Sequence, residues 1–260
     1  MTPDSLMKAH KEANFSRSLY LTFEYGTDRE FQGRSTGDKQ AYLSPSLTYE
    51  APSGFFTSFV ANRVLSPYKR WDETDFTLGW TFKLSKKLEL LTSYTHMNFR
   101  DTSILLQSTL SNNLEVMLHR NSKYLTSRIY FDLNFGKGKT PNDYSFTFEN
   151  SHAFEFENLL TKDNDALKIK PLAILSAGTL NFYKFHLKNR LEKPSLQNLA
   201  VNVNTTFNFT GLEFLLPVEY QIGRFSFEPA FHYSIPLNQP KIYEATPKTY
   251  FTASISFFFI

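Results

Sequence analysis

The chain has 260 residues, enough for one large domain or two small ones, and its 28 Lys and Arg against 25 Asp and Glu give a net charge of +3. Positive and negative residues are so nearly balanced that the composition is a poor match to a nucleic-acid-binding protein. No cysteine is present, which excludes a disulfide scaffold, a cysteine-based zinc site and a thiol nucleophile. Aromatic residues form 17% of the chain although its mean hydropathy is negative, so large apolar residues must be interleaved with polar ones.

Residues 1–15 differ in pattern from the rest of the chain. They contain Lys8, Lys11 and Glu12 and lack the apolar stretch of a signal peptide. Helical spacing is persuasive only in residues 4–12. No apolar run reaches the roughly 18 residues of a membrane-spanning helix. We therefore expect either an intracellular protein or a mature chain whose signal peptide has been removed, with 1–15 as a short N-terminal segment and 16–260 as one domain.

From residue 16 onward, apolar and polar residues alternate with a period of two. Phe76, Leu78 and Trp80 are separated by Thr77 and Gly79, for example. This period is that of a strand with one apolar and one polar face. The alternation predicts strands, in chain order, at 16–27, 39–51, 54–65, 73–84, 88–99, 103–119, 123–135, 143–157, 167–177, 179–190, 198–209, 212–222, 225–235 and 248–260.

Two tight turns are predicted from a change in which positions are apolar. A two-residue hairpin loop moves the apolar set from odd to even numbers. The set changes after Phe209, across Thr210-Gly211, and changes back across Gly223-Arg224. We therefore expect a meander of three antiparallel strands in this region.

The predicted strand number is about fourteen, with twelve as the alternative. Two joints are open. First, Ser111-Asn112-Asn113 could divide strand 103–119 into two strands. Second, Ala177-Gly178 could lie inside one long strand 167–189, because the apolar positions do not change from odd to even there. If both changes are made they cancel, and fourteen strands remain.

Alternation alone fits either a soluble β-sandwich or a membrane barrel, but three features favour the barrel. The polar faces consist mainly of Ser, Thr, Asn and Tyr with spaced charges. Aromatic residues lie near strand ends, as an interfacial belt requires. The strands have about the 9–11 residues that cross a bilayer at a tilt. We therefore predict an all-β protein, a transmembrane antiparallel up-and-down β-barrel, in which the apolar face contacts lipid.

Connection lengths agree with a barrel whose termini are both periplasmic. Long polar connections at 28–38, 66–72 and 236–247 are expected outside the cell, and tight ones at 52–53, 85–87 and 223–224 in the periplasm. Three connections fit less well: a tight external turn at 210–211 and longer periplasmic segments at 158–166 and 191–197. In this arrangement 1–15 is a short periplasmic segment.

The C-terminal strand TYFTASISFFFI resembles the assembly signal of bacterial outer-membrane β-barrel proteins. The matching positions are Phe251, Ile255, Phe257 and Phe259, and the final residue is Ile260. The preceding block, LEFLLPVEYQIGRFSFEPAFHYSIPLNQP, resembles the penultimate hairpin of small outer-membrane barrels. The resemblance implies export to the periplasm, insertion by the barrel-assembly machinery and a location among the lipids of the bacterial outer membrane.

The predicted inward faces carry charges of both signs. One interpretation is a charged wall that sets solute preference. The other is a ladder of ion pairs between strands that partly fills the lumen. The candidate lumen-lining residues are Arg128, Asp132, Glu149, Glu155, Lys168, Lys170, Lys184, His186, Lys188, Glu213, Glu219, Glu228 and His232.

No motif of catalysis, nucleotide binding or metal binding is found, so we expect no catalytic residues, metal or cofactor. Glu228 and His232 share a face but lie four positions apart on one strand. The leading hypothesis is a narrow channel for passive passage of small solutes. The alternatives are a structural or accessory subunit of an outer-membrane complex with a closed lumen, and an outer-membrane lipid- or peptide-modifying enzyme.

Overall fold

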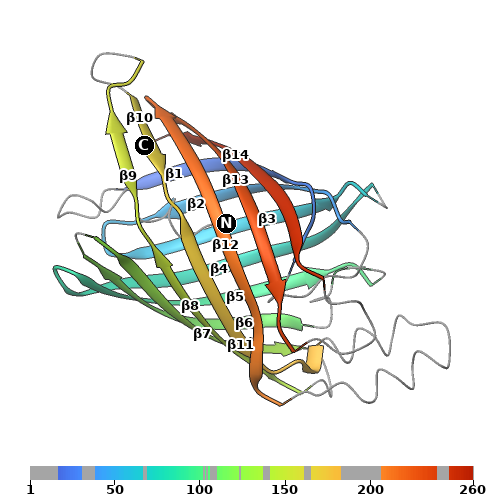
Figure 1. The fold of residues 1–260 in the computed structure, drawn as a ribbon. Helices are drawn as coiled ribbons and strands as arrows, with labels where there is room; N and C mark the ends of the chain where they lie inside the picture. The colour runs from blue at the N-terminus through green and yellow to red at the C-terminus, as the bar shows by residue number, and fades with distance from the viewer. Residues whose placement is uncertain are drawn as a thin grey trace.

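The computed structural model describes residues 17–30, 39–66, 69–101, 103, 105, 110–122, 124–136, 141–160, 165–182, 206–238 and 246–259. Over these residues the chain forms one antiparallel sheet of 14 strands (Figure 1). The segment predicted at 1–15 lies outside the described residues. No described helix is long and apolar enough to cross a membrane. The strands are β1 (Ser18–Gly26), β2 (Tyr42–Glu50), β3 (Phe55–Val64), β4 (Arg70–Ser85), β5 (Leu88–Phe99), β6 (Leu110–Asn121), β7 (Thr126–Gly136), β8 (Asp143–Ser151), β9 (Phe154–Glu157), β10 (Asp165–Ile169), β11 (Leu172–Gly178), β12 (Asn208–Ile222), β13 (Phe225–Pro236) and β14 (Lys248–Phe258).

The sheet closes on itself as a barrel. The first strand pairs with the last, since Leu21 of β1 lies opposite Phe257 of β14. The ring is completed where β11 pairs with both β8 and β12. The closed ring therefore contains twelve strands, β1 to β8 and β11 to β14, and β9 and β10 bring the sheet to 14. The predicted antiparallel up-and-down barrel is confirmed. Of the two predicted strand numbers, twelve is that of the closed ring and fourteen is that of the whole sheet.

Strands β9 and β10 form a hairpin that projects from one end of the ring (Figure 1). β9 follows β8 after a break at residues 152–153, and β11 follows β10 after a break at 170–171. Pro171 has no backbone N–H, which explains the second break. The predicted strands 143–157 and 167–177 are thus each divided in two. β10 pairs with β12, whereas β9 pairs only with β10.

The turn predicted at Thr210-Gly211 is wrong, because β12 runs through these residues. The register changes from Ser176 opposite Gly211 to Ala177 opposite Phe209, which makes Thr210 the extra residue of a β-bulge. One extra residue shifts the apolar set by one position, as a two-residue turn does. The turn at Gly223-Arg224 is confirmed, and Gly223 adopts the positive φ of 55° that glycine tolerates best.

Connections at one end are mostly shorter than those at the other. Those at the first end are 51–54, 86–87, 122–125, 223–224 and, longer than the rest, 158–164. The connections 27–41, 65–69, 100–109, 137–142, 179–207 and 237–247 lie at the other. The apparent exception at 210–211 disappears, because it is a bulge, and 191–197 lies outside the described residues. Most of the predicted strands 179–190 and 198–209 lies outside the described residues, and 179–182 contains only a helical turn.

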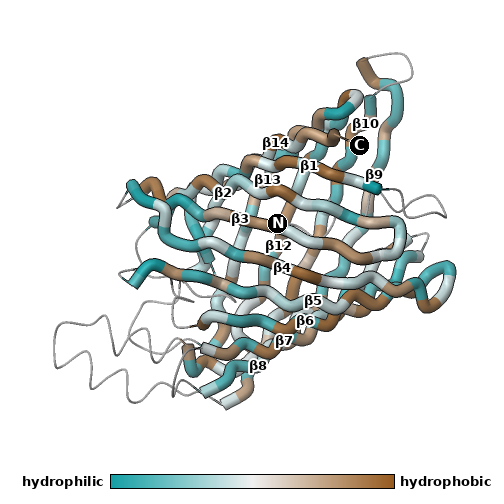
Figure 2. Tube along the Cα trace, turned by 180° about the vertical axis from the view of Figure 1, so that it is seen from behind, coloured by the Kyte–Doolittle hydropathy of each residue, from teal (hydrophilic) through white to brown (hydrophobic). Residues whose placement is uncertain are grey.

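The two faces of the strands differ as the alternation requires. Phe23 is 48% exposed on the outer face of β1, whereas its neighbour Thr22, on the inner face, is 8% exposed. Figure 2 shows the same alternation of apolar and polar residues along the strands. The barrel therefore has an apolar outer surface and a largely polar lumen. Exposed outward residues on the other strands include Leu47, Phe59, Phe76, Trp80, Leu114, Phe131, Phe146, Phe214, Phe227 and Phe251.

Candidate functional site: the lumen

The ring encloses a polar cavity. Two regions of about 550 and 510 Å³ adjoin, because they share several lining residues. The half of the lumen nearer the long connections is called the outer half, and the half nearer the short turns is the inner half. The region of about 550 Å³ lies in the outer half, and the region of about 510 Å³ extends from it to Phe56, Leu91 and Met117 in the inner half. The shared residues are Glu30, Asp75, Thr95, Asn113, Glu115 and Tyr250.

Strand periodicity places polar groups on this wall. On β6, Asn113 and Glu115 line the cavity, while Leu114 and Val116, which alternate with them, are 44% and 43% exposed on the outside. If the pairing of this strand shifted by one residue, its apolar side chains would face the lumen and its charged side chains would face lipid. The register of the strand is therefore strongly fixed. The predicted residues Asp132 and Glu213 also line this cavity.

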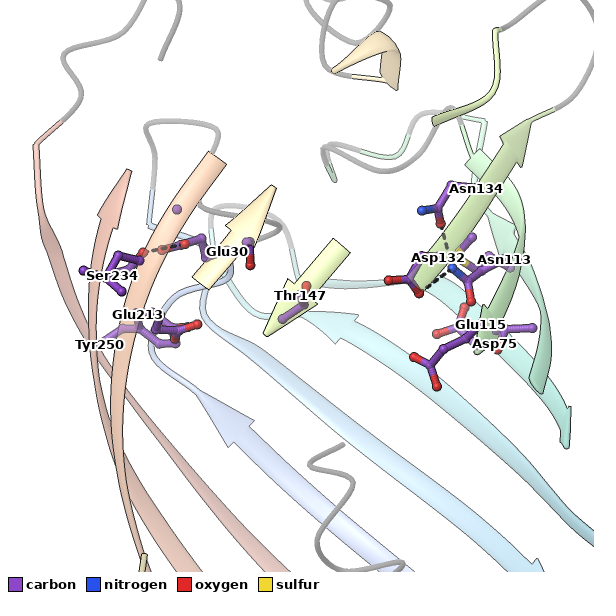
Figure 3. A pocket seen from close by; sticks show the side chains of 15 residues that line it. Glu30, Asp75, Asn113, Glu115, Asp132, Asn134, Thr147, Glu213, Ser234 and Tyr250 are labelled. Carbon is purple, nitrogen blue, oxygen red and sulfur yellow. Dashed lines mark hydrogen bonds between the residues drawn. The ribbon is translucent and has the colours of Figure 1, made fainter. Parts of the chain in front are cut away.

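Acidic side chains face one another across the cavity. Figure 3 shows Asp75, Glu115 and Asp132 on one wall and Glu30 and Glu213 on the other. Neutral groups hold several of them in place. Asp132 accepts hydrogen bonds from Asn113 Nδ2 and Ser145 Oγ, both at 3.1 Å. Such bonds orient a carboxylate without cancelling its charge.

A hydrogen-bonded chain crosses three neighbouring strands. His232 Nδ1 lies 2.9 Å from Glu213 Oε1, and His232 Nε2 lies 3.0 Å from Thr252 Oγ1. Tyr250 donates to Glu213 Oε1 at 2.6 Å and stacks on the imidazole at 4.2 Å between ring centroids. Glu213 and His232 were predicted to line the lumen, but the sequence did not predict their contact. Leu215 lies opposite His232, so Glu213 is a diagonal neighbour that only the strand register identifies.

The connection after β1 folds inward. Arg29 Nη2 donates to Glu73 Oε2 on β4 at 2.6 Å, while Ser234 Oγ on β13 donates to Glu30 Oε1 at 2.5 Å. These partners lie on opposite sides of β1, so the segment 28–30 spans part of the outer lumen. Burial raises the pKa of Glu30 to about 7, and the charge of Glu213 adds to the effect against the Ser234 hydrogen bond. The sequence indicated only a polar loop here.

Apolar side chains fill part of the inner half. Phe56, Leu91, Met117 and Tyr130 form one buried cluster on the inner face of β3, β5, β6 and β7. Gly79 makes room for it, because a Cβ at this position would lie 2.3 Å from Phe56 Cζ. The sequence prediction missed this cluster.

Ion pairs occur in both halves of the lumen: Arg29 pairs with Glu73 in the outer half, and the inner half holds pairs of its own. Arg128 Nη1 lies 2.6 Å from Glu149 Oε1, with side chains 3% and 8% exposed. At the inner end of the lumen, Lys168 of the projecting hairpin lies opposite Glu219 in the register of β10 and β12, and Lys170 interacts electrostatically with Glu228 and Glu219. A space of about 40 Å³, lined by Glu219 and Glu228, adjoins the larger cavity through Glu24, Ser44 and Val60.

The other predicted residues fall elsewhere. Glu155 is exposed on β9, opposite Lys168 and outside the ring. Lys184, His186 and Lys188 lie outside the described residues. In the candidate assembly signal, Phe251, Ile255 and Phe259 are 56%, 53% and 40% exposed, and Phe257 packs against Phe225 at 4.9 Å between centroids. These four side chains belong to the outer surface, and their role as a signal stays a prediction.

A closed antiparallel barrel with an apolar outer face, a polar lumen and short turns at one end defines a bacterial outer-membrane β-barrel protein. No family model and no curated protein sequence matches the chain.

Solved structures of outer-membrane barrels share the fold. The KdgM porin has a TM-score of 0.54 and 7% identity, over 92% of this chain and 98% of that one. The NanC porin gives 0.51 and 9%, over 92% and 98%. LpxR from Salmonella typhimurium gives 0.52 and 10%, over 92% and 100%. At these identities the similarity establishes the fold alone.

Proposed function

We propose that the protein is a narrow outer-membrane channel for passive passage of small solutes. The observation that carries the proposal is the series of adjoining polar cavities inside a closed ring, which narrows from about 550 and 510 Å³ to about 40 Å³. A twelve-strand ring lies between small barrels filled by side chains and the open sixteen-strand porins. The similarity to the KdgM and NanC porins supports a transport role, and KdgM has been solved with oligogalacturonate.

The inward segment and the apolar cluster explain how the passage is narrowed. Residues 28–30 reduce the outer half, and Phe56 and its neighbours occupy one side of the inner half. A polar path remains along β1, β2, β13 and β14, where Thr22, Ser46, Ser226 and Ser256 line the small space. Only small solutes fit such a path.

Single-channel recording in planar bilayers tests this proposal. The wild type is expected to show discrete openings of low conductance, and Phe56→Ala should raise the conductance because it removes a ring from the lumen. Phe59→Ala is the matched control, since Phe59 lies on the same strand but is 50% exposed on the outer face. An electrically silent wild type would contradict the channel.

An accessory subunit remains the second candidate, and the projecting hairpin favours it. Phe154, Phe156, Leu159 and Leu160 are 46–79% exposed there, beyond the ring. A silent barrel that co-purifies with another outer-membrane protein in mild detergent, and loses it on Phe154→Ser and Phe156→Ser substitution, would establish this function instead.

We propose a non-enzymatic role, although Glu213, His232 and Thr252 are linked in the order of a hydrolytic relay. β14 pairs with β1 and β13 at Thr252, so its backbone N–H groups are engaged in the sheet instead of facing a developing oxyanion. Wild type and His232→Ala are both expected to lack esterase activity on p-nitrophenyl esters. Activity that disappears in the variant would contradict this.

A further inference from the structure

The charges on the cavity wall are predominantly negative. Among the described residues that line the two large cavities, seven bear a carboxylate and only Arg29 bears a permanent positive charge. The chain as a whole is slightly basic, so the asymmetry is local. The seven residues are Glu24, Asp28, Glu30, Asp75, Glu115, Asp132 and Glu213.

The described positive groups leave most of these carboxylates without an ion pair. Arg29 makes its ion pair with Glu73, which is 2% exposed. Lys248 Nζ lies 4.0 Å from Asp28 Oδ2, at the limit of an ion pair. His232, bonded to Glu213, is a neutral imidazole or a single charge among the seven acids.

Glu115 is the clearest case. Its side chain is largely enclosed on β6 and points into the cavity (Figure 3). Within the described part of the chain no hydrogen bond or ion pair reaches its carboxylate, and the charge that acts on it is the like charge of Asp132. A carboxylate in this position has no counter-charge among the described residues, and a passing cation is the group that would supply one.

We propose that the lumen selects for cations, and thus for small solutes that carry an amine or another positive group, over anions. This inference rests on the proposed channel function. Fixed charges are screened over about 8–10 Å at 0.10–0.15 M salt, so carboxylates on facing walls of a narrow lumen act together on a solute between them. Oligogalacturonate, which is solved with the KdgM porin, is a polyanion that such a wall would repel.

Reversal potentials under a KCl gradient test the inference. We expect the wild-type reversal potential to lie toward the potassium equilibrium potential, and liposomes containing the protein to swell faster with arginine than with glutamate. Glu115→Gln should shift the reversal potential toward zero, and the triple variant Glu115→Gln, Asp132→Asn, Glu213→Gln should shift it further. Because Glu115 makes no hydrogen bond to a described residue, its single variant removes charge without breaking one.

Glu157→Gln is the matched control, since this carboxylate is exposed on β9 outside the ring. Its reversal potential should equal that of the wild type. This result would show that the shift in the lumen variants does not come from the change in the net charge of the protein. Openings that favour chloride, or a triple variant with unchanged selectivity, would overturn the inference while leaving the channel intact. A complete absence of openings would overturn the proposed function and the inference with it.

Discussion

The outer and inner halves of the lumen are built on the same strands, but their charged side chains have different surroundings. In the outer half, Glu115 and Asp132 face the cavity with only neutral or like-charged described neighbours. In the inner half, Arg128 and Glu149 pair at 2.6 Å, and an apolar cluster occupies the adjacent wall. Ion pairs occur in both halves, since Arg29 also pairs with Glu73 in the outer half. The halves differ in the apolar cluster, which narrows the inner half, and in the carboxylates without a described counter-charge, which make the outer half acidic.

The largest effect is expected where the inner half depends on pairing. Arg128→Ala leaves Glu149 buried without its partner, and we expect a loss of about 3–5 kcal/mol in the free energy of unfolding. Urea unfolding in vesicles, followed by tryptophan fluorescence, measures it. Arg224→Ala is the control, because Arg224 is exposed in the β12–β13 turn and its loss should change stability by less than about 0.5 kcal/mol. Equal stability of the two variants would show that the Arg128–Glu149 pair is solvated and does not stabilise the inner half.

A smaller effect is expected where the inner half depends on packing. Gly79→Ala places a Cβ about 2.3 Å from the Phe56 ring and 2.8 Å from the Thr92 carbonyl oxygen. We expect a cost of about 1–3 kcal/mol from overpacking, measured by the same unfolding assay.

The double variant with Phe56→Ala separates ring crowding from backbone crowding. If the ring is the main obstacle, the Gly79→Ala substitution costs less in the Phe56→Ala background than alone. Full additivity would mean that the added methyl group never meets the ring.

The alternation of residues predicts most of this architecture, because it fixes which face of each strand meets lipid. It predicts the inward positions of Asp132 and Glu213, since their numbers alone determine their side of the sheet. It does not distinguish a bulge from a turn, because both move the apolar set by one position, and for that reason Thr210-Gly211 was assigned wrongly.

Other features depend on information that alternation does not carry. The contact of Glu213 with His232 follows from the register between strands, which the turns and bulges set together. The inward path of residues 28–30 has no periodic pattern that indicates it. The apolar cluster did leave a signal: Phe55-Phe56, Leu90-Leu91 and Val116-Met117 are consecutive apolar pairs, and one member of each must face the lumen.

The smallest effect is expected from a single ionisation in the outer half. The pKa of Glu30 is raised to about 7, so its carboxyl is largely neutral at pH 6 and largely charged at pH 8. Because ionisation of Glu30 adds a negative charge to the cavity wall, cation selectivity should rise modestly between about pH 6 and pH 8. Reversal potentials across this pH range measure the change, and Glu30→Gln should remove it while leaving the selectivity that the other acids supply. A wild-type selectivity that falls as the pH rises would contradict the assignment of Glu30 to the conducting part of the lumen, and with it the acidic character proposed for the outer half.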